Sequence, residues 1–187
     1  MSERAPFKDW DAVAAVIAAG IGLIALLVSG YTAYLQRQQV RAQVWPRLQL
    51  LWYPGERAFH VANRGMGPAR MMAVRVLVDG KPVRTWGQMQ ERFGIDLPSS
   101  QTELGTAVIS PGQEFNFFFL ARDQGKAAAD AFEELRGQKH HTLGIVGCYC
   151  SVLDDCWEVG LGRLDRQVDP NREIGSCRNN DREKFEQ

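Results

Sequence analysis

The feature that most constrains this chain is a stretch near its N-terminus without any charged residue. Between Asp11 and Arg37 lie 25 consecutive uncharged residues. The segment from Ala12 to Gly30 is apolar throughout except for Ser29. At about 1.5 Å per residue, a helix over the whole uncharged stretch spans about 37 Å, more than the roughly 30 Å hydrocarbon core of a bilayer. The stretch therefore predicts a helix that crosses a membrane once.

The composition of this stretch favours insertion into lipid. Nine of its residues between Val13 and Val28 are Val, Ile or Leu, and each favours insertion by about 0.3 to 0.6 kcal/mol, for a sum of about −3 to −5 kcal/mol. Aromatic residues flank it, namely Phe7, Trp10, Tyr31 and Tyr34. The alternative is a cleaved signal peptide, but the apolar run exceeds the roughly 7 to 15 residues of a typical signal. We therefore expect an uncleaved anchor.

Small side chains recur along one side of the predicted helix. They are spaced four, four, three and four residues apart: Ala14, Ala18, Gly22, Ala25 and Ser29. Such a stripe lets a second helix approach closely, which predicts association with another copy of the chain or with another membrane protein. The alternative is that alanine and glycine are simply frequent in membrane helices.

The chain changes character after the apolar run. Helix should continue to about Val44, because Pro46 disfavours the α conformation in the residue before it. From Arg47 onward the hydrophobic period becomes two, as in strands. The last residues, Arg178 to Gln187, are too polar to be expected to fold. We therefore divide the chain into a tail at 1–10, a transmembrane helix at 11–35, a helical stalk at 36–46, a β domain at 47–165 and a polar tail at 166–187.

Alternating apolar residues predict six or seven short strands in the β domain. The clearest are 47–52, 58–62, 72–78, 115–120, 143–152 and 157–161. Within 115–120, alternation places Phe117 and Phe118 on opposite faces, and Asp79-Gly80 is typical of a tight hairpin turn. Helical spacing predicts one helix from Gly125 to Arg136, and 85–93 is a second short helix or a loop. The pattern predicts a mainly β fold, an antiparallel sandwich with one inserted helix.

Several motifs resemble those of bacterial immunoglobulin-like modules of the cell-adhesion-related type. The segment Phe59-His-Val-Ala-Asn-Arg-Gly-Met-Gly-Pro-Ala, followed by a Val-rich strand and Asp79-Gly80, is similar to their V-x-N-x-G-x-x-P-A … D-G-x pattern. Ile109-Ser-Pro-Gly-Gln is similar to their I-x-P-G-Q/E step. The Cys-Tyr-Cys-Ser and Cys-Trp segments resemble uncharacterised bacterial proteins with an N-terminal anchor. The resemblance implies an immunoglobulin-like sandwich outside the cytoplasm, from which the inserted helix and the cysteine cluster depart.

Four cysteines are candidate disulfide partners: Cys148, Cys150, Cys156 and Cys177. An even count fits two disulfides in an oxidising compartment, although buried thiols or a metal site give the same count. Strand alternation points Cys148 and Cys150 into an apolar face with Val146. A five-residue loop would set Cys150 opposite Cys156, whereas a two-residue turn would not. Pairing of Cys150 with Cys156 and of Cys148 with Cys177 is therefore a hypothesis.

A metal site is the alternative for the same region. It would use the nitrogen and sulfur ligands that zinc prefers, from His140, His141, Cys148, Cys150 and Cys156. A single C-x-C on a strand lacks the paired C-x2-C of structural zinc sites, so we expect structural disulfides, no cofactor and no redox role. Asp154-Asp155 is typical of a turn, and His60 has no neighbouring nucleophile. We therefore expect no catalytic residue.

Charge excludes one class of partner and leaves orientation open. The chain has 22 basic and 22 acidic residues, so no net field would draw it to nucleic acid. Basic residues flank the apolar run on both sides, and the positive-inside rule therefore gives no orientation. Disulfides would require an oxidising space, which in a bacterium is the periplasm beyond the inner membrane.

These features predict a non-enzymatic, single-pass membrane protein. Its expected partners are the lipid bilayer and another membrane or envelope protein, or a second copy of itself. In the leading interpretation, the β domain binds or scaffolds that partner. In the second, the chain is an accessory subunit held in a membrane complex through its helix. In the third, the Cys/His cluster serves metal binding or redox chemistry.

Overall fold

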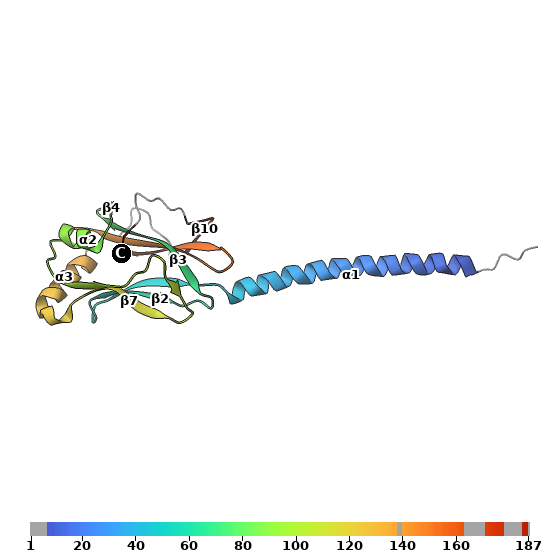
Figure 1. Cartoon of the computed structure of the whole chain (residues 1–187), viewed down its shortest axis with the longest axis horizontal. Helices are drawn as coiled ribbons and strands as arrows, with labels where there is room; N and C mark the ends of the chain where they lie inside the picture. Colours follow the sequence, from blue (N-terminus) through green and yellow to red (C-terminus); the bar gives the residue numbers. More distant parts are fainter. Residues whose placement is uncertain (1–6, 138–139, 163–170, 178–184, 187) are drawn as a thin grey trace, which may run out of the picture. The chain divides into compact units, whose positions relative to one another are not determined.

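The computed structural model describes residues 7–137, 140–162, 171–177 and 185–186. The chain divides into two compact units, Met1–Ala42 and Gln43–Gln187. The first unit holds one helix, and the second is the β-rich domain with its short helices (Figure 1).

The first unit is the long helix that the uncharged stretch predicts. Helix α1 (Phe7–Gln43) has 37 residues. Its segment Trp10–Gln43 is long and apolar enough to cross a membrane, with a mean hydropathy of 2.6 over its most apolar 18 residues, and its side chains are exposed. The helix ends close to Pro46, as predicted, because proline removes a backbone donor and restricts the residue before it. Arg41 in the last turn offsets the partial negative charge of the helix C-terminus.

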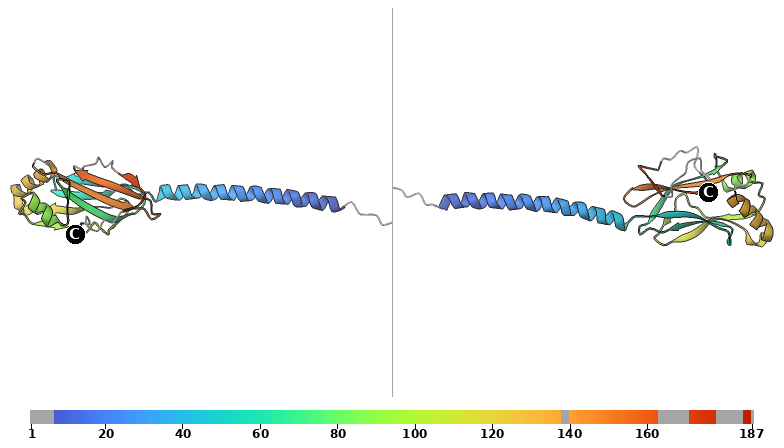
Figure 2. Two further views of the ribbon diagram at one scale, coloured as in Figure 1. Left: turned by 90° about the horizontal axis from the view of Figure 1, so that it is seen from above. Right: turned by 180° about the vertical axis from the view of Figure 1, so that it is seen from behind.

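The second unit consists of two antiparallel sheets, which confirms the mainly β prediction (Figures 1 and 2). The first sheet runs in the order β1 (Leu48–Tyr53), β2 (Ala58–Asn63), β7 (Glu114–Leu120) and β5 (Ser99–Gln101). The second runs in the order β10 (Arg172–Ile174), β9 (Cys156–Gly162), β8 (Leu143–Cys150), β3 (Ala69–Val78) and β4 (Lys81–Val83). The short strand β6 (Val108–Ile109) pairs with the start of β3.

Two short helices and one 3-10 turn lie between the strands. They are α2 (Trp86–Arg92), η1 (Arg122–Gln124) and α3 (Gly125–Gly137). Helix α2 begins where the Thr85 hydroxyl accepts the backbone N–H of Gln88 at 3.2 Å, a normal N-cap. Helix α3 buries Ala128, Phe132 and Leu135, the face that helical spacing predicts. In 85–93 the structure has the short helix rather than the loop.

Aromatic side chains from both sequence halves form the centre of the core. The ring of Phe59 lies 4.9 Å from Trp52 and 5.0 Å from Phe118, measured between ring centroids. Phe117 and Phe118 are both buried, as expected for a central strand. Both rings pack on Phe59, at 6.0 and 5.0 Å between centroids, so the prediction that they lie on opposite faces is wrong. The cause is a register shift in the β2–β7 pairing, where Phe59 faces Phe118 but the next residue faces Asn116. Such a bulge leaves one extra residue, here Phe117, free to turn inward.

The two sheets are also joined by a tyrosine hydroxyl. Tyr149 of β8 is fully buried, and its hydroxyl accepts the backbone N–H of Leu48 of β1 at 3.3 Å. The same hydroxyl donates to the side-chain oxygen of Asn171. Burial raises the pKa of Tyr149 to about 12. The phenol therefore stays neutral at physiological pH and keeps its proton for Asn171.

Residues near the C-terminus are part of the domain, contrary to the polar tail that the sequence predicts. Phe185 is 5% exposed and its ring meets Trp86 at 4.7 Å between centroids. Its backbone N–H donates to the carbonyl of Val74, and that of Glu186 donates to the carbonyl of Arg84. Residues 171–177 add a strand and a disulfide to the second sheet. Burial of the Phe185 ring against Trp86 thus joins residues 185–186 to the core.

We expect Phe185→Ala to lower the free energy of unfolding by about 3 kcal/mol, because the ring fills space against Trp86 that the surrounding side chains cannot close. Urea denaturation of the full chain in detergent micelles, followed by tryptophan fluorescence, measures this loss. Glu186→Ala is the matched control: its exposed ion pair with Arg84 contributes less than about 1 kcal/mol. Equal midpoints for the two variants would show that Phe185 is not part of the core.

Candidate functional site

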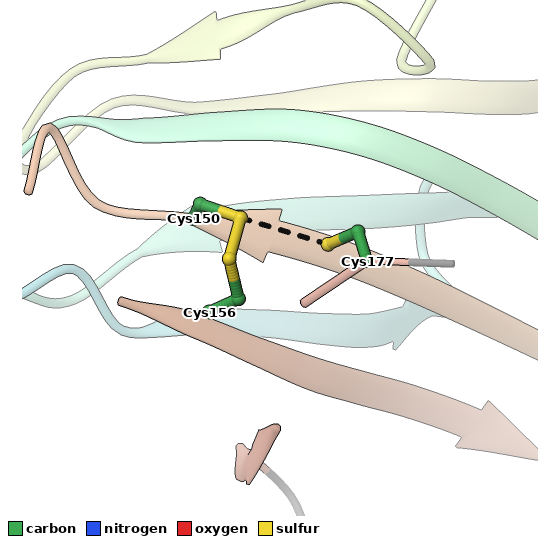
Figure 3. Close-up of side chains that lie close together, drawn as sticks. All are labelled: Cys150, Cys156 and Cys177. Atoms are coloured by element: carbon green, nitrogen blue, oxygen red, sulfur yellow. Dashed lines mark hydrogen bonds between the residues drawn. A yellow bond between two sulfur atoms is a disulfide. The ribbon is translucent and has the colours of Figure 1, made fainter. Parts of the chain in front are cut away.

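The four cysteines form two disulfides, and these are the pairs put forward from the sequence. Cys150 of β8 is bonded to Cys156 of β9 (Figure 3). Cys148 of β8 is bonded to Cys177. The first pair lies directly across the β8–β9 hairpin, because a loop of residues 151–155 sets Cys150 opposite Cys156 in the register. The longer hairpin loop, one of two alternatives that the sequence left open, is therefore the one that forms.

The cysteines lie with Val146 on a buried face of β8, as expected, and this face points away from the core between the sheets. Ile145 and Tyr149 of β8 point into the core between the sheets, whereas Cys148 and Cys150 alternate with them and point away. The cysteines are nevertheless buried, at 8% and 4% exposed. Alternation correctly paired them with Val146, but it does not say which face of a strand meets the other sheet. The disulfide with Cys177 holds a C-terminal segment against this outer face.

The two disulfides touch one another. Cys150 Sγ lies 3.6 Å from Cys177 Sγ (Figure 3), and neither sulfur carries a proton while both bonds are closed. Cys150, Cys156 and Cys177 have sulfur atoms within 4.8 Å of each other, a spacing that suits a metal ion. Metal ligation needs free thiolates, however, and all four cysteines are in disulfides. In this form the four cysteines stabilise the domain as two structural disulfides.

The histidines of the hypothetical metal site lie elsewhere. His140 Nδ1 is 2.9 Å from Glu134 Oε1, and His141 Nδ1 is 2.8 Å from Asp79 Oδ2. They precede β8 and the cysteines end it, so at about 3.3 Å per residue His141 and Cys148 are about 23 Å apart. The structure does not bring His140, His141, Cys148, Cys150 and Cys156 into one site. Hydrogen bonds from the backbone N–H of Thr142 and, to a smaller extent, from the His141 side chain lower the pKa of Asp79 below its ordinary value.

The two disulfides should differ in what they contribute to stability. We expect Cys148→Ala with Cys177→Ala to lower the free energy of unfolding by about 3.5 kcal/mol, and Cys150→Ala with Cys156→Ala by about 2 kcal/mol. The difference arises because the cysteines are 29 and 6 residues apart, and a longer closed loop restricts the unfolded chain more. Urea denaturation of the full chain in micelles under non-reducing conditions measures both. A larger loss for the hairpin pair would contradict this account.

A second polar cluster lies on the outer side of the first sheet. Asn116 Nδ2 donates to Glu56 Oε2 at 2.8 Å, which leaves Asn116 Oδ1 to accept from His60 Nδ1 at 2.8 Å. Nδ1 therefore carries the imidazole proton, and Nε2 presents a lone pair. The Tyr53 ring stacks on the imidazole, and Nε2 is buried without a hydrogen-bond partner among the described residues. Because this nitrogen is closed to solvent, His60 is a structural residue in this conformation, as the sequence suggested.

Asn63, at the end of β2, is a buried side chain whose hydrogen-bonding groups are all used. Its Nδ2 donates to the carbonyl oxygens of Gly67 at 2.8 Å and Ile109 at 2.9 Å. Its Oδ1 accepts the backbone N–H groups of Gly65 at 2.9 Å and Arg47 at 3.2 Å. A fully buried amide thus uses both donors and both acceptor positions. Asn63 joins the β2–β3 loop, β6 and the residues that follow α1.

Gly65 and Gly67, which follow Asn63, must be glycines because the backbone of residues 44–47 lies too close for a Cβ atom. A Cβ on Gly65 would lie 2.4 Å from the carbonyl oxygen of Trp45, and one on Gly67 would lie 1.9 Å from that of Val44. We name residues 44–47 together with 63–67 the stem junction. The Asn-x-Gly part of the family-like segment, together with Gly67, thus has a physical role. It fixes the first residues after α1 to the sheet.

A shallow hollow beside α2 was not predicted. It has a volume of about 500 Å³ and is lined by Gly87, Gln90, Glu91, Gly94, Ile95, Asp96 and Leu97. The amide of Gln90 is already used, since Nε2 donates to the carbonyl of Leu97 at 2.7 Å and Oε1 accepts from Ser99 Oγ at 2.9 Å. Because both ends of the Gln90 amide are hydrogen-bonded within the protein, we regard the hollow as a surface groove. It is lined by α2 and the α2–β5 loop.

Comparison with known proteins gives no relative from which a function can be transferred. The chain matches no protein-family model, no curated protein and no solved structure. Any indication of its function therefore comes from its own strand order, side-chain contacts and exposed surfaces.

The small-residue stripe of α1 lies on the surface of that helix. Ala14, Ala18, Gly22, Ala25 and Ser29 are all exposed. A Cβ added at Gly20 or Gly22 would meet no atom within 4 Å. No contact within the described chain thus requires small side chains at these positions. They leave room for a second helix.

Proposed function

We propose that this protein is a single-pass membrane protein whose β domain is an immunoglobulin-like binding or scaffolding module without catalytic activity. The observation that carries the proposal is the combination of one exposed, apolar helix with a domain whose buried polar groups serve its own fold. The cysteines are tied in disulfides, Asn63 is fully hydrogen-bonded and the histidines pair with carboxylates or amides.

The strand order supports the immunoglobulin-like part of the proposal. An immunoglobulin domain pairs its strands as ABED in one sheet and CFG in the other. If β1, β2, β3, β5, β7, β8 and β9 are strands A to G and β4 is C′, the order β1-β2-β7-β5 corresponds to ABED and β9-β8-β3-β4 to GFCC′. Strand β10 beside β9 and strand β6 beside β3 are additions to that arrangement. The family resemblance of the Val-x-Asn-x-Gly segment, between the second and third strands, points to the same fold.

The domain also departs from that family in specific ways. Its disulfides join β8 to β9 and β8 to the C-terminal segment, instead of joining the second strand to the sixth across the core. Its buried core tryptophans, Trp86 and Trp157, lie on α2 and β9 and not on the third strand. An aromatic cluster around Phe59 lies in the core. We regard the domain as a variant built around aromatic packing.

Two disulfides support a location in an oxidising compartment. Structural disulfides are stable outside the reducing cytosol. We therefore place the anchor in a bacterial inner membrane with the domain in the periplasm, where envelope proteins are the available partners. The bilayer itself is the other partner.

One observation favours the second candidate function, that of an accessory subunit held through α1. The exposed stripe of small residues would let α1 pack closely on a helix of a membrane complex. In that case the helix, rather than the domain, recognises the partner.

Capture of partners from detergent-solubilised membranes by the tagged full-length chain tests both candidates. The stripe variant carries Ala18→Leu, Gly22→Leu and Ala25→Leu. Its matched control carries Leu23→Ile, Leu26→Ile and Leu27→Ile on the same helix, which change side-chain shape but not size. If the domain binds the partner, the stripe variant captures as much as the wild type.

The other outcomes separate the two candidates. Loss of capture in the stripe variant alone supports the accessory subunit. If neither form enriches any protein over a tag-only control, the binding-module proposal is rejected.

A further inference from the structure

The exposed apolar side chains of the domain gather at one end of its two sheets. This end, which we name the stem end, is where the chain arrives from α1. Beside the stem junction it holds the β6–β7 turn, where Asn63 exchanges backbone hydrogen bonds with Gly112 and Gln113, and the β8–β9 turn. In Figure 1 the β8–β9 turn lies at the opposite end of the sheets from α2 and α3.

Among the described residues after Gln43, five of the six large apolar side chains that are exposed belong to the stem end: Trp45, Met66, Val108, Val152 and Leu153. The sixth, Met72, is in β3, which begins there. Met66 is 74% exposed and Val108 60%. Scattered apolar residues on a surface are ordinary, but their gathering at one end marks a surface that meets a partner.

Contacts within the stem end hold these side chains together. The carbonyl of Trp45 accepts the backbone N–H of Met66 at 3.0 Å. Arg70 of β3 is the register partner of both Val108 and Cys150, the residue before the β8–β9 turn. The guanidinium of Arg70 also lies 3.2 Å from Asp154 in that turn. The apolar residues are thus presented by loops that are tied to the same strand ends.

We propose that the stem end docks on the lipid bilayer, with Met66, Val108, Val152 and Leu153 entering the membrane interface. The inference rests on the proposed membrane anchor. Tyr34 marks the end of the apolar run, and Val44 follows it by ten residues, a contour of about 15 Å in a helix. The headgroup region adds roughly 5 to 8 Å beyond the hydrocarbon core. Connectivity alone thus keeps the stem end within about 10 Å of the headgroups.

The charges at the stem end balance one another, so they do not favour an anionic lipid surface over a neutral one. Arg47, Arg64 and Arg70 are balanced by Glu114, Asp154 and Asp155. Arg64 lies 2.7 Å from Glu114, so part of this charge is already neutralised within the domain. Docking should therefore be driven by apolar side chains and Trp45, which suit the interface, and it should occur on zwitterionic phosphatidylcholine.

Photo-crosslinking of the full chain in phosphatidylcholine vesicles tests the proposal. Single variants Met66→p-benzoylphenylalanine and Leu153→p-benzoylphenylalanine probe the stem end. Leu23→p-benzoylphenylalanine in α1 reports the anchor, and Glu91→p-benzoylphenylalanine on α2 is the exposed control at the other end of the domain. We expect lipid adducts, identified by the mass of one phosphatidylcholine, at positions 66 and 153 with yields at least ten times that at 91. Including anionic phosphatidylglycerol should change the yields less than twofold.

The outcomes separate the docking surface from the anchor. Lipid adducts at position 23 with none above the control level at 66 and 153 would reject docking and leave the anchor standing. Absence of adducts at 23 as well would reject both. Adducts between two protein chains at 66 or 153 would make the stem end a contact between copies and overturn the lipid assignment. Peptide mapping without reductant, with both disulfides intact, verifies that each variant has folded.

Discussion

Gly67→Ala is expected to lower the free energy of unfolding of the domain by about 4 kcal/mol, although it adds a single methyl group. That methyl would lie 1.9 Å from the carbonyl oxygen of Val44, a backbone atom, so the segment of residues 44–47 must move away. Moving it breaks the backbone hydrogen bonds from Met66 and Gly67 to Trp45 and from Arg64 to Arg47, each of about 1 kcal/mol. It also removes the bond from Arg47 to the buried Asn63.

Urea denaturation of the full chain in detergent micelles, followed by tryptophan fluorescence, measures this loss. With a dependence of about 2 kcal/mol per molar urea, the midpoint should fall by about 2 M. Gly55→Ala is the matched control, because a Cβ at Gly55 meets nothing within 4 Å. Its midpoint should change by less than about 0.3 M. A Gly67→Ala midpoint equal to the control's would mean that the stem junction does not hold the chain as described.

The second large effect is expected from charge in α1. Leu23→Arg with Leu27→Arg replaces two residues that favour insertion by two that oppose it by about 2.5 to 3.5 kcal/mol each. The pair therefore costs about 6 to 8 kcal/mol, which exceeds the favourable sum of about −3 to −5 kcal/mol for the apolar run. Arginine is a good helix former, so the helix itself should persist. The full chain should move from the membrane pellet to the supernatant on alkaline extraction.

The matched control puts the same two charges outside the apolar run, as Gln36→Arg with Gln39→Arg. This variant should stay in the pellet, because arginine near a helix end reaches the interface with its long side chain. Retention of the Leu23→Arg, Leu27→Arg variant in the pellet would show that the domain, not α1, holds the protein to the membrane. That result would also remove the basis for the anchor.

Local pattern predicts much of this fold, since the elements depend on neighbouring residues. The helix at 125–136, the Asp79-Gly80 turn and the strands around Phe59 and Val146 all follow from hydrophobic spacing and turn chemistry. The length and apolar content of α1 follow in the same way. What spacing fixes is which residues share a face, not which face meets the other sheet. Spacing therefore places Cys148 on one face with Val146, but it does not say that this face points away from the other sheet.

The remaining features depend on contacts between residues far apart in the sequence. The four bonds of Asn63 reach residues from Arg47 to Ile109, and the inward turn of Phe117 needs a bulge against β2. Phe185 is the one aromatic residue in a charged stretch of sequence, and no neighbouring residue indicates that it packs against Trp86. The chain of hydrogen bonds through Asn116 likewise joins a turn and two strands. Such contacts appear only when strand pairing is known.

The position of Phe185 has a consequence for how the protein is made. A ribosome synthesises the chain from its N-terminus at roughly 5 to 20 residues per second, and domains generally fold as units. Cys177 and Phe185 follow every strand that the structure describes. The domain can therefore close its second disulfide and complete its core only after these last two contacts have emerged. A nascent chain that ends before residue 177 would leave Trp86 uncovered and Cys148 with a free thiol, two marks by which cellular quality control can recognise an unfinished product.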